Sequence, residues 1–115
     1  MIKIIKCVIL LQCLLTGCRY QEVKYAYPQE NEVKKGEKFR ITLPENHVEK
    51  ESWSLQPGYD ARVVRRLNEV WHGNEKGIDF NFEALSAGTT TLSFTQRKYA
   101  DTLQTVDYKL KITEN

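Results

Sequence analysis

Apolar and polar residues alternate along much of the chain from about residue 33 onward. Phe39, Ile41 and Leu43 are separated by single polar or charged residues, and Phe80 and Phe82 are spaced in the same way. A period of two puts every second side chain on one face of an extended strand, so each run predicts a half-buried β-strand. The later runs with this alternation are Leu92 and Phe94, and then Val106, Tyr108, Leu110 and Ile112.

Turn signals separate these runs at short intervals. They are Lys35-Gly36, Pro57-Gly58, His72-Gly73-Asn74, Lys76-Gly77 and Ala87-Gly88. Several short strands at this spacing, without a convincing amphipathic helix, predict an all-β sandwich or barrel.

The segment 60–70 is the ambiguous one, because Val63, Val64, Leu67 and Val70 fit one face of a helix as well. We expect a strand there. Val63-Val64 is a β-branched pair, and the segment lies between two turn signals.

The first residues have the pattern of a processing signal. Lys3 and Lys6 precede an apolar run, residues 7–15, that is too short to span a bilayer. The run ends in Leu15-Thr16-Gly17-Cys18, which looks like the bacterial lipobox, where a lipid is attached to the cysteine thiol before cleavage. We therefore expect residues 1–17 to be a signal peptide and Cys18 to be lipidated.

Removal of this segment changes the charge and the cysteine content. The chain has 17 basic and 15 acidic side chains, and two of the basic ones lie in the signal, so the remainder has a balanced formal charge. A balanced surface gives no general attraction to phosphate backbones, which argues against nucleic acid as a partner. Cys7 and Cys13 leave with the signal and Cys18 carries the lipid, so no thiol remains for a disulfide or a nucleophile.

The remaining candidate chemistry is sparse. His47 and His72 fall on predicted loops, but neither HxH nor HExxH spacing surrounds them, and no nucleophile elbow surrounds any serine. We expect no enzyme activity, no metal and no cofactor. Tyr20, Tyr25 and Tyr27 cluster after the predicted anchor, where they either pack on the first edge strand or bind a partner. The period of two favours packing, with Tyr25 and Tyr27 filling the edge of the sandwich.

Framework residues over about 36–112 show a resemblance to a known family. They are Gly36-Glu37, Leu43-Pro44, Trp53, Ala87-Gly88-Thr89 and Leu92-Ser93-Phe94. In these residues the chain resembles the chagasin-type inhibitors of papain-like cysteine peptidases. The resemblance implies an immunoglobulin-like antiparallel β-sandwich. It also implies a binding face made of three loops at one end, which fill the cleft of the peptidase.

The resemblance assigns three segments of this chain to those loops. The family's first loop reads Asn-Pro-Thr-Thr-Gly-Tyr, and the equal-length segment here is Asn46, His47, Val48, Glu49, Lys50 and Glu51. The second, glycine-rich loop corresponds to His72, Gly73, Asn74, Glu75, Lys76 and Gly77. The third loop carries Arg-Pro-Trp in the family, and this chain has Arg97, Lys98 and Tyr99 in the same place. Arginine and tyrosine are both enriched among the residues that dominate binding energy at interfaces.

Together these observations predict a lipoprotein in three parts. We expect a signal peptide at 1–17, a lipidated tether with a first edge strand at 18–32, and a chagasin-like domain at 33–115. The expected function is inhibition of a papain-like cysteine peptidase by a monomer anchored in the cell envelope, with the outer membrane facing the periplasm as the expected location. Two alternatives stay open, namely an immunity-type lipoprotein that neutralises a toxin and an accessory subunit of an envelope complex that pairs through an edge strand.

Overall fold

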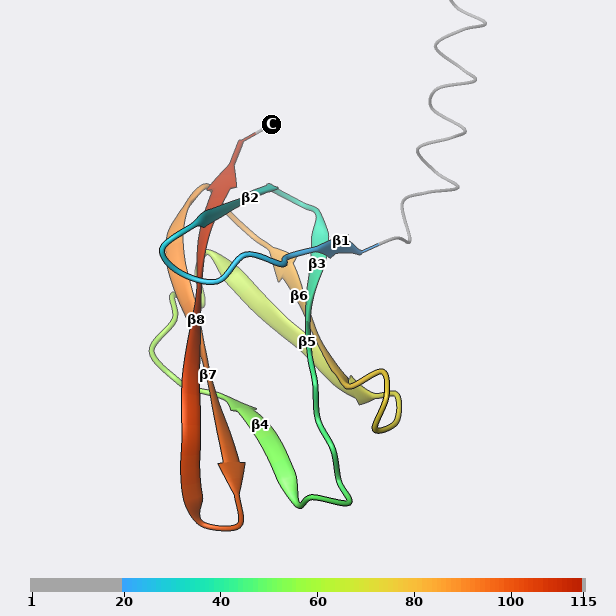
Figure 1. Ribbon diagram of the computed structural model, residues 1–115. Helices are drawn as coiled ribbons and strands as arrows, with labels where there is room; N and C mark the ends of the chain where they lie inside the picture. Colours follow the sequence, from blue (N-terminus) through green and yellow to red (C-terminus); the bar gives the residue numbers. More distant parts are fainter. Residues whose placement is uncertain (1–19, 115) are drawn as a thin grey trace, which may run out of the picture.

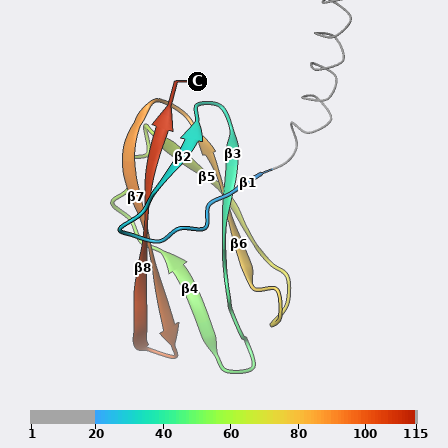
Figure 2. The same ribbon diagram turned by 45° about the horizontal axis from the view of Figure 1, so that its top comes forward.

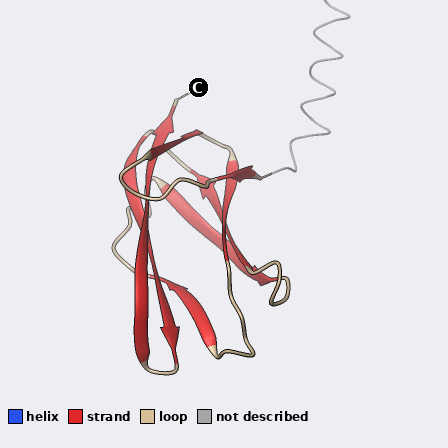
Figure 3. Cartoon of the chain, viewed as in Figure 1, coloured by secondary structure: helices blue, strands red, loops and turns tan. Residues whose placement is uncertain are grey.

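The computed structural model describes residues 20–114, which form a sandwich of two four-stranded sheets (Figures 1 and 3). The predicted signal peptide and Cys18 lie outside the described residues. The strands are β1 (Gln21–Glu22), β2 (Glu30–Lys34), β3 (Lys38–Leu43), β4 (Glu51–Leu55), β5 (Val64–Trp71), β6 (Ile78–Ala84), β7 (Gly88–Lys98) and β8 (Asp101–Thr113). No helix occurs among residues 20–114, and therefore none there is long and apolar enough to cross a membrane.

One sheet has the strand order β1-β3-β6-β5, and the other has the order β2-β8-β7-β4. Most neighbours are antiparallel, whereas β1 pairs with β3 and β2 pairs with β8 in parallel. The expected all-β immunoglobulin-like sandwich is confirmed. The N-terminal segment supplies an edge strand to each sheet, because the chain crosses from β1 to β2 over one side of the sandwich (Figure 2).

The core lies between the sheets, at the positions that the alternation predicts. Phe39 and Ile41 on β3 pair with Phe82 and Phe80 on the neighbouring β6, and all four are fully buried. Burial of each such side chain stabilises the fold by about 1.5–3 kcal/mol. The opposite sheet contributes Val33, Trp53, Leu92, Phe94, Tyr108, Leu110 and Ile112 to the same core.

The strand expected within 60–70 is also confirmed, with its start at Val64. Val63 and Val64 are buried, whereas most of β5 beyond them is exposed, because it forms the outer edge of its sheet. An irregularity at Leu67 shifts the register between Arg66 and Asn68. This bulge explains why the apolar residues of the segment match a helical spacing as well as an alternating one.

The expectation that Tyr25 and Tyr27 line the sandwich edge is wrong. The two residues are 60% and 66% exposed, and neither belongs to a strand. Val23 takes the core position instead, and the chain then leaves the first sheet to reach the second. The strand β1 ends at Glu22, so the alternation of a strand does not apply to the side chains that follow.

The register of the strands shows which segments lie at each end of the sandwich. β1 pairs near the start of β3, at Phe39 and Arg40, whereas β3 ends at Leu43 before the first predicted loop. The C-terminal end of β8 lies beside the end of β2. Residue 20 and the C-terminal end therefore lie toward the end of the sandwich opposite the three predicted loops (Figure 1).

Candidate functional site

The first loop connects β3 to β4, and Asn46 organises it. The side-chain carbonyl of Asn46 accepts hydrogen bonds from the backbone N–H of Val48 at 2.9 Å and of Glu49 at 3.3 Å. Its backbone carbonyl accepts the N–H of Glu51 at 3.2 Å, which closes the loop. This is an Asx-type turn, which a short polar side chain forms with its own backbone. Val48 lies at the surface of the loop, where the residue is 72% exposed.

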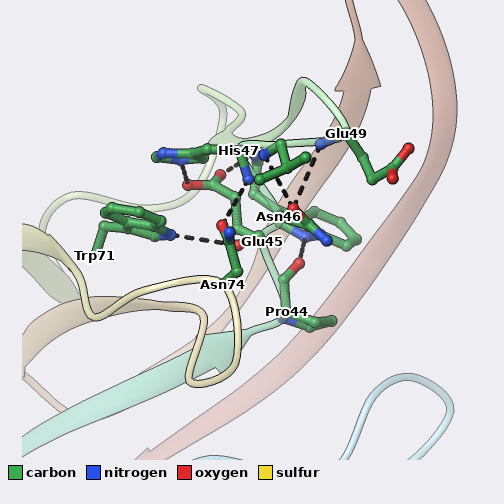
Figure 4. A network of polar contacts seen from close by, with 9 residues as sticks. Pro44, Glu45, Asn46, His47, Glu49, Trp71 and Asn74 are labelled. Carbon is green, nitrogen blue, oxygen red and sulfur yellow. Dashed lines mark hydrogen bonds and ion pairs between the residues drawn. The ribbon is translucent and has the colours of Figure 1, made fainter.

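Glu45 is a buried acid at the base of this loop, with 4% of its surface exposed. One carboxylate oxygen accepts the backbone N–H of Trp53 at 2.6 Å, and the other lies 2.8 Å from Nε2 of His47 (Figure 4). The indole N–H of Trp53 donates to the carbonyl of Pro44 at 2.7 Å. A buried carboxylate is tolerated only where such partners replace water. Because its partners are Trp53 on β4 and His47 in the loop, Glu45 fixes the loop to β4.

Trp71, the last residue of β5, joins the first loop to the second. Its ring stacks on the His47 imidazole with 3.9 Å between centroids and 12° between planes. Its indole N–H donates to the backbone carbonyl of Glu45 at 3.3 Å, and the Asn74 side chain accepts the His47 N–H at 2.9 Å (Figure 4). The two loops are thus held together by stacking and by hydrogen bonds. The residue pattern gave no reason to include Trp71, because it lies just before the predicted turn.

The second loop, residues 72–77, depends on its glycines. The His72 N–H donates to the Gly77 carbonyl at 2.8 Å, and the Gly77 N–H donates to the Gly73 carbonyl at 2.9 Å. Gly77 is buried with φ of 81°, and a Cβ there would lie 2.2 Å from the backbone oxygen of Leu43. Gly77 therefore shapes the loop from within, whereas Glu75 and Lys76 remain exposed.

Asp79 provides the electrostatic support behind the second loop. Its carboxylate accepts the Thr42 hydroxyl at 2.7 Å and lies 2.8 Å from His72 Nε2 and 3.3 Å from the Arg40 guanidinium. Burial raises the pKa of Asp79, but the hydrogen bonds from Thr42 and His72, with the charges of His72 and Arg40, outweigh it and lower that pKa below its ordinary value. His72 is thereby tied to the outer face of its own sheet, away from His47.

The third loop is the tip of the β7–β8 hairpin. Tyr99 lies at this tip with φ of 57°, and the residue is 75% exposed. Arg97 pairs with Thr102 and Gln96 with Gln104, so Leu103 is the extra residue of a bulge and is also exposed. A positive φ is costly for a residue with a β-carbon, by about 1 kcal/mol or more, and such strain is typical of functional positions.

The first loop also lies next to the third. The Lys98 ammonium is 3.7 Å from the Glu49 carboxylate. An open groove between the two loops is lined by His47, Lys50, Glu51, Ser52 and Tyr99. The structure therefore brings all three predicted segments together, with the first loop in the centre.

The individual residues have different positions in this arrangement. His47, Val48, Glu49, Lys50, Asn74, Glu75, Lys76, Arg97, Lys98 and Tyr99 are exposed at the loop end, whereas Asn46, Glu51 and Gly73 are half-buried and Gly77 is buried. Within residues 20–114, no three histidine, cysteine or acidic side chains lie close enough to hold a metal ion. The arrangement is suited to contact with another surface.

No family model matches the chain, and no curated protein matches its sequence. Solved structures do match its fold. The cysteine protease inhibitor EhICP2 from Entamoeba histolytica superposes with a TM-score of 0.68 at 14% identity, over 82% of this chain and 95% of that chain. Amebosin superposes with a TM-score of 0.55 at 15% identity, over 83% of this chain and 99% of that chain. The chain therefore has the chagasin-type immunoglobulin-like fold that its framework residues predict.

Proposed function

We propose that the protein inhibits a papain-like cysteine peptidase by inserting its three loops into the active-site cleft. The fold shared with a cysteine protease inhibitor supports this function, and so does the convergence of the three loops at one end of the sandwich. The mechanism is occlusion of the cleft without a covalent step.

The observation that carries the proposal is the fixed conformation of the first loop. This loop lacks the Pro, Thr and Gly residues that give the family's loop its small, rigid form. Here the buried Glu45, the Asn46 turn and the stack of His47 on Trp71 supply that rigidity from other residues. A loop that is already ordered loses little conformational entropy on binding, which favours tight association.

Tyr99 is the proposed aromatic anchor of the third loop. It takes the position of the tryptophan in the family's motif, and Arg97 keeps the place of the family's arginine. Tyrosine combines a large apolar ring with a hydroxyl group at a small entropic cost, and it is enriched among residues that dominate binding energy. Its place beside the groove of the first loop lets both loops contact one target.

The proposed location is the cell envelope, with a lipid on Cys18 holding the domain at the outer membrane. The lipobox-like residues before Cys18 support this location. The loops lie at the end of the sandwich away from residue 20, so the anchor leaves them accessible (Figure 1).

The test is titration of papain with the purified protein up to micromolar concentrations. We expect inhibition that Tyr99→Ala weakens about tenfold or more, equivalent to the loss of a hot-spot contact of at least about 1.4 kcal/mol. Tyr25→Ala is the matched control, because it removes another exposed tyrosine, which lies between β1 and β2 and not in any of the three loops. Absence of inhibition, or equal weakening by both substitutions, would refute the proposal for papain.

The charges on the first loop favour a second candidate, an immunity-type protein that neutralises a toxin. Glu49 and Lys50 are exposed where the family has small neutral residues, and Glu49 is paired with Lys98. Charged loops are suited to a partner of complementary charge. This candidate predicts capture of a toxin that Glu49→Lys abolishes, with no effect on any cysteine peptidase.

A further inference from the structure

A short segment between β1 and β2 exposes two tyrosines that the proposed inhibitory site does not use. This segment, residues 23–29, is named here the tyrosine strap. It crosses one side of the sandwich and carries Tyr25 and Tyr27, the most exposed aromatic residues of the described chain outside the loop end. Its sequence is Val-Lys-Tyr-Ala-Tyr-Pro-Gln, in which Lys24 is the one charged residue.

The strap is fixed to the sandwich by its backbone. The buried side chain of Asn31 donates to the Tyr25 carbonyl at 2.7 Å and accepts the Tyr25 N–H at 3.3 Å. The Tyr27 N–H donates to the carbonyl of Asp107 at 2.8 Å, and Val23 is buried in the core. The two tyrosine rings therefore extend outward from an ordered backbone. Exposed aromatic rings held in this way offer apolar area that a contact can bury.

The position of the strap relates it to the proposed anchor. Tyr20 is the first described residue and directly precedes β1. The centre of its ring lies 5.1 Å from the Arg40 guanidinium. Two residues of chain span at most about 7 Å, so a lipid on Cys18 would hold Tyr20 close to a bilayer. Tyr25 follows Tyr20 by five residues, which span at most about 18 Å. The strap is thus within reach of the surface that would hold the anchor.

We propose that the tyrosine strap is a second membrane contact, in which Tyr25 and Tyr27 insert among the lipid headgroups beside the anchor. This inference rests on the proposed lipidation of Cys18. Tyrosine is enriched at membrane interfaces because its ring is apolar and its hydroxyl reaches water and headgroups. Lys24 adds a cation that favours anionic lipid, and the two acids that flank the strap, Glu22 and Glu30, are paired with Arg40 and Lys109.

The contact fixes the orientation of the domain. With the strap on the bilayer, the side of the sandwich formed by β1 and β2 faces the lipid. Tyr27 bonds to Asp107, six residues along β8 from Asp101 at the hairpin tip, which corresponds to about 20 Å of strand. The loop end then extends beyond the contact, where a soluble target reaches it.

The experiment uses tryptophan fluorescence in vesicles of phosphatidylethanolamine and phosphatidylglycerol with brominated acyl chains, which quench nearby indoles. The full-length protein, isolated with its anchor, carries either Tyr25→Trp or Tyr27→Trp. We expect most of the added emission to be quenched. The matched control is Tyr99→Trp, which places an indole at another exposed position, on the loop end, and its emission should persist. Unquenched emission from both strap variants would overturn the proposal, as would equal quenching of the control.

Mass spectrometry of Cys18 tests the proposed lipid anchor separately from the proposed membrane contact of the strap. If Cys18 carries no lipid, the proposed anchor fails, and the same measurement on unanchored protein decides the strap alone. Quenching of Tyr25→Trp would then support a contact without an anchor, whereas unquenched emission would overturn it. A third outcome would also overturn the membrane assignment. In it the strap variants show no quenching, but the protein captures another protein and loses this capture when Tyr25→Ser and Tyr27→Ser are combined.

Discussion

Glu45→Ala is the substitution that tests the support of the first loop most directly. It leaves the buried N–H of Trp53 without its acceptor at 2.6 Å and removes the carboxylate 2.8 Å from His47. An unsatisfied buried donor costs about 1–3 kcal/mol, and a charge-assisted hydrogen bond contributes about 1.5–3 kcal/mol. Because the two effects share one side chain and half of His47 is exposed to water, we expect a loss of about 3 kcal/mol in the free energy of unfolding.

Urea unfolding followed by tryptophan fluorescence measures this loss. With a slope of about 1–2 kcal/mol/M for a domain of this size, the midpoint should fall by about 2 M. Glu45→Gln keeps an acceptor for the Trp53 N–H, so it should lose only about 1 kcal/mol. Glu49→Ala, which removes an exposed acid of the same loop, should change stability by less than about 1 kcal/mol. Equal effects of the Ala and Gln substitutions at Glu45 would refute a role as acceptor.

Three further predictions concern the second loop and its supports. Trp71→Ala should weaken the proposed inhibition of papain about tenfold, through loss of the stack that orders the first loop, and titration of papain with the variant measures it. Gly77→Ala should lower the unfolding free energy by more than about 2 kcal/mol, because its Cβ would meet the Leu43 oxygen, whereas Gly36→Ala has open space and should cost about 1 kcal/mol. The lowered pKa of Asp79 means that its stabilisation is complete above its unfolded pKa near 3.9 and is lost as pH falls through its folded value. Asp79→Asn should therefore flatten the acid limb of the stability profile in that range, and an unchanged limb would contradict it.

The strands could be predicted from the sequence because their signal is local. Phe39, Ile41 and Leu43 alternate with polar residues, and each is buried as the alternation requires. The grouping of the three loops followed from the resemblance, which carries the order of the strands with it. A period of two identifies a strand, but it does not determine which strands are neighbours.

The supports of the site could not be predicted, because they join residues far apart in the chain. Glu45 is an acid after a proline, and nothing beside it in sequence indicates that it is buried against Trp53. Trp71 meets the backbone of Glu45 across 26 positions of the chain. Tyr25 fits the alternation but lies past the end of β1, where the hydrogen bonds of Asn31 determine the path. In each case a tertiary contact outweighs the local pattern.

The parallel pairing of β1 with β3 has a mechanical consequence. β1 begins beside the start of β3, and β3 leads toward the loops. When the N-terminal end is held and a captured target pulls on the loops, the two strands are drawn past each other lengthwise. Their hydrogen bonds then share the load instead of opening one at a time. The β1–β3 pairing thus opposes by shear a force along the line that joins the N-terminal end to the loops.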